Sequence, residues 1–170
     1  GMLAAQRELL DRIRALPGIT RAAPIVEGQV MAAPNDVTSG VLVRGMRARD
    51  LASLTTVSKT LSPGALTAFQ GGDAVIIGAG LAEKLGIGPG ANITLIAARG
   101  NVTPFGVTPR IKTYTVAGVF KIGMTLYDNS YIFMPLDEAQ LFFNKSGSVS
   151  AIEVMTGETH ALAWSASSRD

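Results

Sequence analysis

The stretch "DAVIIGAGLAEKLGIGPGANITL", from Asp73 to Leu95, decides how the middle of this sequence folds. Ala74 to Ile77 is a short apolar run, and Gly78 and Gly80 follow it directly. A dinucleotide-binding unit begins with a strand, a glycine turn and a helix, in this order, and the helix N-terminus binds the pyrophosphate. The stretch therefore raises the question whether these glycines hold a nucleotide or serve the fold.

The residues after the glycines favour a structural role. Glu83 stands where a third glycine would let the helix pack close to the strand. The helix from Leu81 to Leu85 is too short for a parallel crossover, which takes about a dozen residues, because turn-forming residues follow it: Gly86, Gly88, Pro89 and Gly90. Asn92 to Arg99 holds no carboxylate for a ribose. We predict a strand, a short surface helix and a turn into the next strand, with no nucleotide or other cofactor.

The ends of the sequence carry helical patterns. Met2, Leu9, Ile13 and Leu16 repeat at helical spacing with Gln6 on the same face, and Pro17 and Gly18 end this helix. We expect Leu9 and Ile13 to pack against a last strand, at 151–155, through Ile152 and Val154. A second helix from Pro135 through Phe143 is favoured by the proline at its start and the acidic residues in its first turn.

Short strands fill the region between these helices. We expect strands at 19–33, 41–43, 74–77, 93–97, 113–120 and 131–134. Pro24 suits an edge strand or a bend in the first of them. Arg47 to Leu61 has no clean period and reads as irregular chain with at most one helical turn, and Gly123 to Ser130 reads as a turn. Many short strands with a helix near each end predict an α+β fold.

Composition limits the class of protein. The chain has 170 residues, of which 47% are hydrophobic, a formal charge of +2 and no cysteine. It can bury one core or two small ones, and it forms no disulfide. The basic residues are scattered, so we predict no nucleic-acid partner. No run approaches the ~18 apolar residues of a membrane span. Gly1 ahead of Met2 resembles a tag-removal scar, so we expect a piece of a longer protein.

Catalytic patterns are missing from the sequence. His160 is the only histidine and stands in a polar tail without clustered carboxylates, so we interpret it as a solvated residue. Four aspartates fall in turn-like contexts, where the side chain caps the backbone: Asp36, Asp50, Asp73 and Asp128. No nucleophile elbow, phosphate loop or metal-ligand spacing occurs. We predict a protein that is not an enzyme and has no metal site.

The segment "RGNVTPFGVTPR", Arg99 to Arg110, departs from an ordinary connection between two strands. Hairpin loops usually have about two to five residues, and longer ones are commonly functional or disordered. Pro104 and Pro109 stiffen this loop and remove two backbone donors, while Thr103 to Gly106 suits a type I turn. Phe105 at the tip either folds back onto its own domain or anchors a partner.

Four stretches carry a resemblance to a known family. They are "VLVRGM" (Val41 to Met46), "VIIGAGLAEKLGIGPGANITLI" (Val75 to Ile96), "TPFGVTPRIKTYTVAGVF" (Thr103 to Phe120) and "GMTLYDNSYIFMPLDEAQLFF" (Gly123 to Phe143). In this order they resemble the periplasmic domain of lipoprotein-releasing ABC transporter permeases of the LolC/LolE type, within the MacB-like periplasmic core domain family. In that family the glycine-rich segment is structural.

The resemblance implies a domain between the first two transmembrane helices of an inner-membrane permease, in the periplasm of a Gram-negative bacterium. It implies a β-rich Sabre-like part, residues 29–146, and an α/β Porter-like part, residues 1–28 and 147–170. After Met155 the sequence departs from the family pattern, so the Porter-like part is expected to be incomplete. The implied partners are outer-membrane lipoproteins, a soluble LolA-like carrier, a second permease subunit and a cytoplasmic ATPase subunit.

The resemblance also implies a role for the long loop. In LolC-type permeases a projecting loop of the form Thr-Pro-x-Gly-x-x-Pro, called the Hook, recruits the carrier. The predicted carrier-binding residues are Thr103, Pro104, Phe105, Gly106, Val107, Pro109 and Arg110. Arg99, Arg110 and Lys112 are expected to flank the loop as rim charges. The alternative is a MacB-like efflux permease domain, which shares the fold and lacks this loop.

Overall fold

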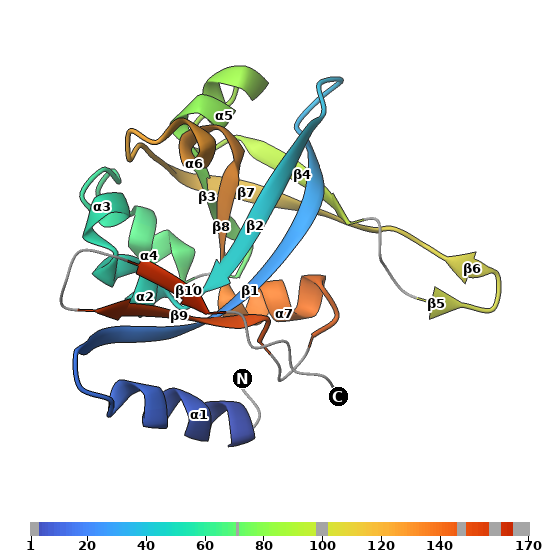
Figure 1. The fold of residues 1–170 in the computed structure, drawn as a ribbon. Helices are drawn as coiled ribbons and strands as arrows, with labels where there is room; N and C mark the ends of the chain where they lie inside the picture. The colour runs from blue at the N-terminus through green and yellow to red at the C-terminus, as the bar shows by residue number, and fades with distance from the viewer. Residues whose placement is uncertain (1–3, 71, 98–101, 146–148, 157–160, 165–170) are drawn as a thin grey trace.

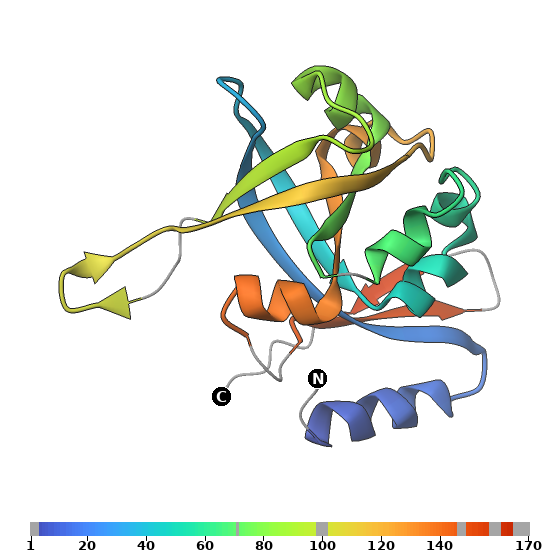
Figure 2. The same cartoon turned by 180° about the vertical axis from the view of Figure 1, so that it is seen from behind.

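The computed structural model describes residues 4–70, 72–97, 102–145, 149–156 and 161–164 (Figures 1 and 2). Its centre is a sheet that closes on itself. Strand β1 (Ile19–Ala33) pairs with β2 (Ser39–Met46), and β8 (Tyr131–Pro135), β3 (Ala74–Gly78), β7 (Arg110–Phe120) and β4 (Asn92–Ala97) follow in order. β4 pairs back onto β1 through Met31 and Ile96. The six strands therefore form a small barrel.

Strand direction within the barrel is mixed. β2 pairs with β8 in parallel, and so does β3 with β7, whereas the other neighbours are antiparallel. The predicted strands at 41–43, 74–77, 93–97, 113–120 and 131–134 all lie in it. The α+β fold class predicted from the sequence is confirmed.

The barrel interior is apolar because alternate residues of each strand point inward, as in Val41 and Val43 against the more exposed Leu42 and Arg44. Helix α5 (Ala79–Leu85) covers one end of the barrel, and α7 (Leu136–Phe142) covers the other (Figure 1). Leu81 and Phe142 from these helices belong to the same buried cluster as the strand residues. The sequence predicted both helices at these positions.

Three short helices cover the outer face of β3, β7 and β8. They are α2 (Ala48–Ser53), α3 (Thr55–Ser58) and α4 (Ala65–Phe69). Leu51, Val57 and Phe69 from these helices pack in a second buried cluster with Ile76 and Phe120. The prediction of irregular chain from Arg47 to Leu61 was therefore wrong. The helical period of this segment does not show in the sequence. Each helix buries only one or two residues, and charged and hydroxyl side chains stand between them.

Helix α1 (Ala4–Arg14) packs against β1 and β9 (Ala151–Thr156). Ile152 and Val154 lie under it as predicted, but the residue it buries fully is Leu10, whereas Leu9 and Ile13 are half-buried. Leu16 is 56% exposed because the helix ends at Arg14, so the helical spacing no longer applies. Leu9 and Ile13 thus pack against this cluster as predicted, and Leu10, which the sequence did not single out, is buried most deeply.

Strand β1 belongs to two groups of strands. Its first half pairs with β9, which in turn pairs with β10 (Ala161–Trp164), and its second half is part of the barrel. Pro24 pairs with Ile152 on one side, and pairing with β2 begins only at Val26. Pro24 thus lies in an edge-like part of the strand, as its missing N–H requires. β10 was missed, because 151–155 was taken as the last strand.

The predicted division into two parts falls within β1, at Gly28. It remains a prediction. A cluster of ion pairs joins the two halves of this strand to their neighbours. Glu153 of β9 binds Arg21 through Oε1 at 2.5 Å and Arg44 of β2 through Oε2 at 2.9 Å. Arg44 also binds Glu27. All four side chains are at most 32% exposed, so solvent screens these charges less than it would at the surface.

The segment from Gly123 to Ser130 is a helix rather than the predicted turn. Helix α6 (Thr125–Ser130) lies against α5, and Asp128 caps the chain before it by accepting hydrogen bonds from the N–H groups of Ile122 (2.9 Å) and Gly123 (3.0 Å). The backbone-capping role predicted for Asp128 is confirmed. The Asp-Asn-Ser composition, typical of turns, here ends a helix.

Candidate functional site

The candidate site is a two-stranded hairpin that projects from the barrel between β4 and β7 (Figure 2). Strand β5 (Val102–Thr103) pairs with β6 (Gly106–Val107), and Pro104 and Phe105 form the turn. The hairpin is a sheet of its own, because the barrel ladder ends at the pair formed by Ala97 and Arg110. The sequence predicted a stiff projection with a turn at Thr103 to Gly106, but not its two strands.

Backbone conformation explains the residues at the tip. Proline fixes φ near −65°, which suits the second position of a turn, so Pro104 favours this conformation before any partner binds. Gly106 has φ of +119°, a region that residues with a side chain rarely adopt. The Pro-Phe-Gly sequence therefore holds Phe105 at the end of a preformed turn.

Phe105 is 100% exposed. Pro104, Gly106 and Pro109 are exposed too, and Arg110 at the root is half-buried. Thr103 and Val107 are strand residues of the hairpin, and Arg99 lies outside the described residues. The interpretation in which Phe105 folds back into its own domain is therefore wrong, whereas the carrier-binding role of the seven predicted residues remains a prediction.

The root of the hairpin is fixed by a polar cluster. Lys112 Nζ donates a hydrogen bond to Glu138 Oε1 of α7 at 2.6 Å and lies 3.0 Å from Asp73 Oδ1. Tyr114 donates to the same Glu138 oxygen at 2.8 Å. The hydrogen bond to Glu138 raises the pKa of Lys112, and burial raises the pKa of Tyr114. Lys112 therefore ties β7 to α7. Its side chain is 41% exposed, and its role as a rim charge remains a prediction.

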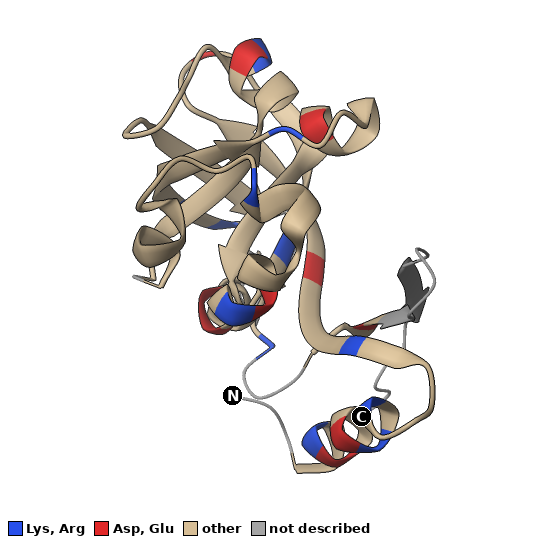
Figure 3. Ribbon diagram, turned by 90° about the vertical axis from the view of Figure 1, so that its left-hand side faces the viewer, with Lys and Arg blue, Asp and Glu red and all other residues tan. Residues whose placement is uncertain are grey.

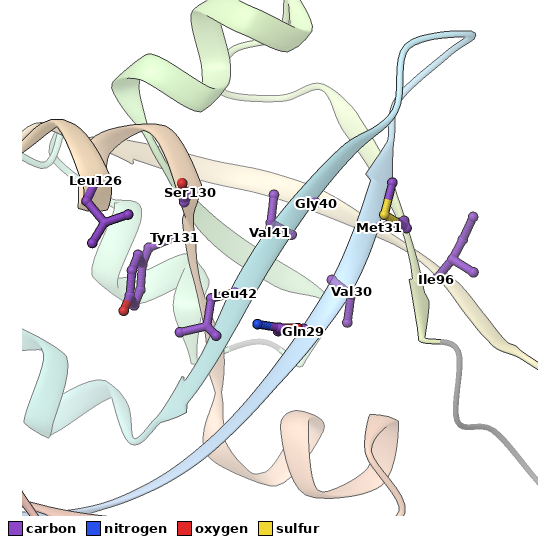
Figure 4. A pocket seen from close by; sticks show the side chains of 10 residues that line it. All are labelled: Gln29, Val30, Met31, Gly40, Val41, Leu42, Ile96, Leu126, Ser130 and Tyr131. Atoms are coloured by element: carbon purple, nitrogen blue, oxygen red, sulfur yellow. The ribbon is translucent and has the colours of Figure 1, made fainter.

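An apolar groove of about 580 Å³ runs along the outside of β1 and β2 toward α6 (Figure 4). Met31, Ile96 and Leu126 line it, and none of its lining side chains is charged. Ile96 pairs across the sheet with Ile111, which is 58% exposed beside the hairpin root. Sequence reasoning missed this apolar strip. Its signal is Ile111, which precedes Thr113 and Thr115 on the outer face of β7.

The glycines of the opening stretch contact protein rather than solvent. A Cβ on Gly78 would lie 2.6 Å from the carbonyl carbon of Asp128, and one on Gly80 would lie 2.8 Å from Cγ of Asn129. Helix α6 therefore occupies the side of the β3–α5 turn from which an added side chain would project. This contact supports the structural role predicted for both glycines.

Other kinds of site find little support in the part of the chain that the structure describes. No group of three or more His, Asp or Glu residues there is placed to hold a metal ion. Basic and acidic residues are interspersed, as the ribbon coloured by charge shows (Figure 3). None of the helices among the described residues is long and apolar enough to cross a membrane. His160 lies outside those residues.

Comparison with known sequences gives related permeases. The family model of the MacB-like periplasmic core domain matches residues 3–163. The lipoprotein-releasing system transmembrane protein LolC of Neisseria meningitidis is 32% identical over 87% of the chain. LolC of Xylella fastidiosa is 23% identical over 77% of the chain. The chain spans about a third of the length of these relatives, 36% and 32% respectively.

Solved structures share the fold. The extracellular domain of the noncanonic ABC-type transporter YknZ from Gram-positive bacteria matches with a TM-score of 0.60 and 16% identity, over 89% of this chain and 73% of that one. The periplasmic region of MacB from Actinobacillus actinomycetemcomitans matches with a TM-score of 0.56 and 9% identity, over 91% and 65%. With the family match and the LolC relative at 32% identity, the protein belongs to the MacB-like periplasmic core domain family and is a periplasmic domain of the LolC permease type.

Proposed function

We propose that this domain serves lipoprotein release by binding a soluble periplasmic carrier through the β5–β6 hairpin. The observation that carries the proposal is the complete exposure of Phe105 at the tip of a projecting, preformed turn. Exposed aromatic side chains at the centre of an interface often contribute most of its binding energy. A carrier of lipid-bearing proteins needs an apolar pocket, which is the complement that a phenyl ring requires.

The rigidity of the hairpin supports this role. Binding orders flexible side chains and loops at a cost of about 0.5–1.5 kcal/mol for each immobilised side chain. Pro104 and the β5–β6 pairing order the turn in advance, so less of this cost falls on the binding step. The tie from Lys112 to Glu138 holds β7, which leads out of the hairpin, against α7. The anchor is thus carried by a preformed turn above a fixed root.

The relatives' names suggest the wider process. Both LolC relatives are named as transmembrane proteins of a lipoprotein-releasing system. In the proposed arrangement this domain is part of a permease paired with a second permease subunit. ATP hydrolysis takes place in a cytoplasmic subunit, and outer-membrane lipoproteins are the cargo. The domain itself would act by binding and movement, with no catalytic residue and no bound cofactor.

The proposal is tested by comparing the carrier affinity of the Phe105→Ala variant with that of the wild-type chain. The LolA-like carrier of the source organism is titrated with the wild-type chain and the variant, and the thermal midpoint of each chain is measured alongside. We expect affinity to fall at least thirty-fold, about 2 kcal/mol, with an unchanged midpoint, because Phe105 is exposed. Val37→Ala, which truncates a 47% exposed side chain between β1 and β2, should leave affinity unchanged.

Two outcomes would contradict this function. Unchanged carrier affinity of Phe105→Ala would remove the hairpin from the interface. Absence of any carrier binding by the wild-type chain would favour the alternative, an efflux permease domain, whose fold relative is the MacB region.

A further inference from the structure

A second pocket, of about 470 Å³, lies where α1, the start of α2, α4 and the start of α7 meet. Its lining includes buried apolar side chains: Met46, Phe69 and Leu136. Three arginines also line it, Arg7 from α1 and Arg47 and Arg49 from the start of α2. The fold thus gathers basic residues that are 40 positions apart in the sequence, around a floor of buried apolar side chains.

The arginines have more hydrogen-bond donors than the neighbouring protein satisfies. Arg47 Nε donates to Asp50 Oδ2 at 2.6 Å, but Arg47 Nη2 is buried without a hydrogen-bond partner among the described residues. Arg7 and Arg49 are exposed and make no hydrogen bond or ion pair with any described residue. A buried donor without an acceptor costs free energy that a bound oxygen would recover. The three arginines therefore have donors left over for an added acceptor oxygen.

The charges point to an anion. Asp137 is the acidic side chain that lines the pocket, against three arginines. Asp50 offsets part of the Arg47 charge from behind. Guanidinium groups bind phosphate through pairs of parallel N–H donors, and they are less strongly hydrated than an ammonium group. A phosphate in this pocket would contact the arginines, above a floor that Met46, Phe69 and Leu136 form.

We propose that this pocket binds a phosphate ester, either the headgroup of an anionic phospholipid or a small soluble phosphate. Both ligands present the same phosphate oxygens to the arginines, and the test below separates them. The site does not involve the β5–β6 hairpin, so it stands or falls independently of carrier binding.

Paired substitutions of equal charge test the proposal. Arg7→Gln with Arg49→Gln removes two pocket arginines. Arg12→Gln with Lys84→Gln removes two exposed basic side chains from α1 and α5 outside the pocket. Neither pair breaks a contact among the described residues, so the thermal midpoints should not change. Each chain is sedimented with phosphatidylcholine vesicles that contain or lack phosphatidylglycerol, and is titrated with glycerol 3-phosphate and inorganic phosphate under NMR observation.

The vesicle measurement distinguishes a site from general attraction. A basic residue near an anionic membrane surface changes affinity about five-fold, so the pocket pair should weaken binding to phosphatidylglycerol vesicles about 25-fold and the control pair far less. That result supports the lipid headgroup. A soluble phosphate is supported by a different result. Glycerol 3-phosphate then shifts the NMR signals of Gln70 and Ala48, the pocket pair abolishes these shifts, and phosphatidylglycerol vesicles are not preferred. Equal weakening by both pairs, or no binding of any probe, overturns the proposal.

Discussion

The backbone carbonyl carbon of Asp128 lies 2.6 Å from the point where a side chain on Gly78 would begin. Helix α6 approaches the end of β3 this closely because Gly78 has no Cβ. The contact joins two segments that the sequence separates by 50 positions. It explains why a glycine follows the buried strand in a domain for which we predict no nucleotide.

Gly78→Ala should therefore destabilise the fold. The added methyl group meets backbone atoms, which have no freedom to rotate away, so we expect a loss of about 1–3 kcal/mol in the free energy of unfolding, measured in urea. Gly40→Ala is the matched control, because a Cβ there meets nothing within 4 Å. A Gly78→Ala variant as stable as the control would show that α6 yields to the methyl group.

Nucleotides should not bind. Calorimetry with ATP and with NAD at millimolar concentration should give no heat beyond dilution, because α6 lies against the glycine turn and Glu83 replaces the third glycine. Saturable heat with either nucleotide would contradict the structural role of Gly78 and Gly80.

Helix α1 should be held mainly by Leu10. Leu10 is 1% exposed, so Leu10→Ala should cost about 2–5 kcal/mol of unfolding free energy. Ile13→Ala should lower the free energy of unfolding by less, because Ile13 is half-buried. Leu16→Ala should change it by less than about half a kcal/mol, because Leu16 is 56% exposed. Urea unfolding of the three alanine variants gives the order. A larger effect at Ile13 than at Leu10 would contradict the burial of this helix in the structure.

Glu153→Gln should weaken the junction between β9 and the barrel. The carboxylate is 8% exposed and binds both Arg21 and Arg44. Its neutralisation removes the counter-charge that Arg21 has in this cluster and leaves Arg44 with Glu27. Removing one partner of a buried ion pair costs about 3–5 kcal/mol. Glu83→Gln, on the exposed side of α5, provides the control in the same urea experiment. Equal free energies of unfolding for the two variants would contradict a stabilising role of the Glu153 ion pairs.

Stability should fall at alkaline pH, in part through Tyr114. Burial and the hydrogen bond to Glu138 raise the pKa of Tyr114 in the folded state. The contribution of the Tyr114 hydroxyl to the free energy of unfolding is therefore complete below about pH 10, the ordinary pKa of tyrosine. It is lost as the pH rises above that value. Above pH 10 the wild-type free energy of unfolding should fall more steeply than that of Tyr114→Phe, by up to about 1.4 kcal/mol per pH unit. Parallel pH profiles would show that Tyr114 does not titrate differently on unfolding.

The elements with a strong local pattern were predictable. β3 and β4 are short apolar runs bounded by glycine and proline, and α7 begins directly after Pro135. Alternate apolar residues of both strands, such as Val75 and Ile93, face the barrel interior, so period and burial agree. The family resemblance rested on these same stretches.

The elements that were missed lack such a pattern. α2 and α3 are six and four residues long, too short for a helical period to show. Glu153 gave no signal because its two partners lie on β1 and β2, far away in the sequence. The arginine pocket was invisible for the same reason, since Arg7 and Arg49 meet only after folding.

The site itself was predictable in part. Proline and glycine around Phe105 indicated a stiff turn, because both residues act through local backbone geometry. Whether the ring is exposed depends on the distance between the hairpin and the barrel, which no local pattern contains. The structure supplies that fact, and with it the choice between an anchor and a fold-back residue.

The continuity of β1 has a mechanical consequence. Its 15 residues extend about 50 Å, at ~3.3 Å per residue, from the end of α1 into the barrel. A pull applied through α1 would load this strand along its length. Seven register pairs with β2 would then bear the load in shear, all at once, instead of opening one after another. The strand is thus suited to transmit force from α1 to the barrel.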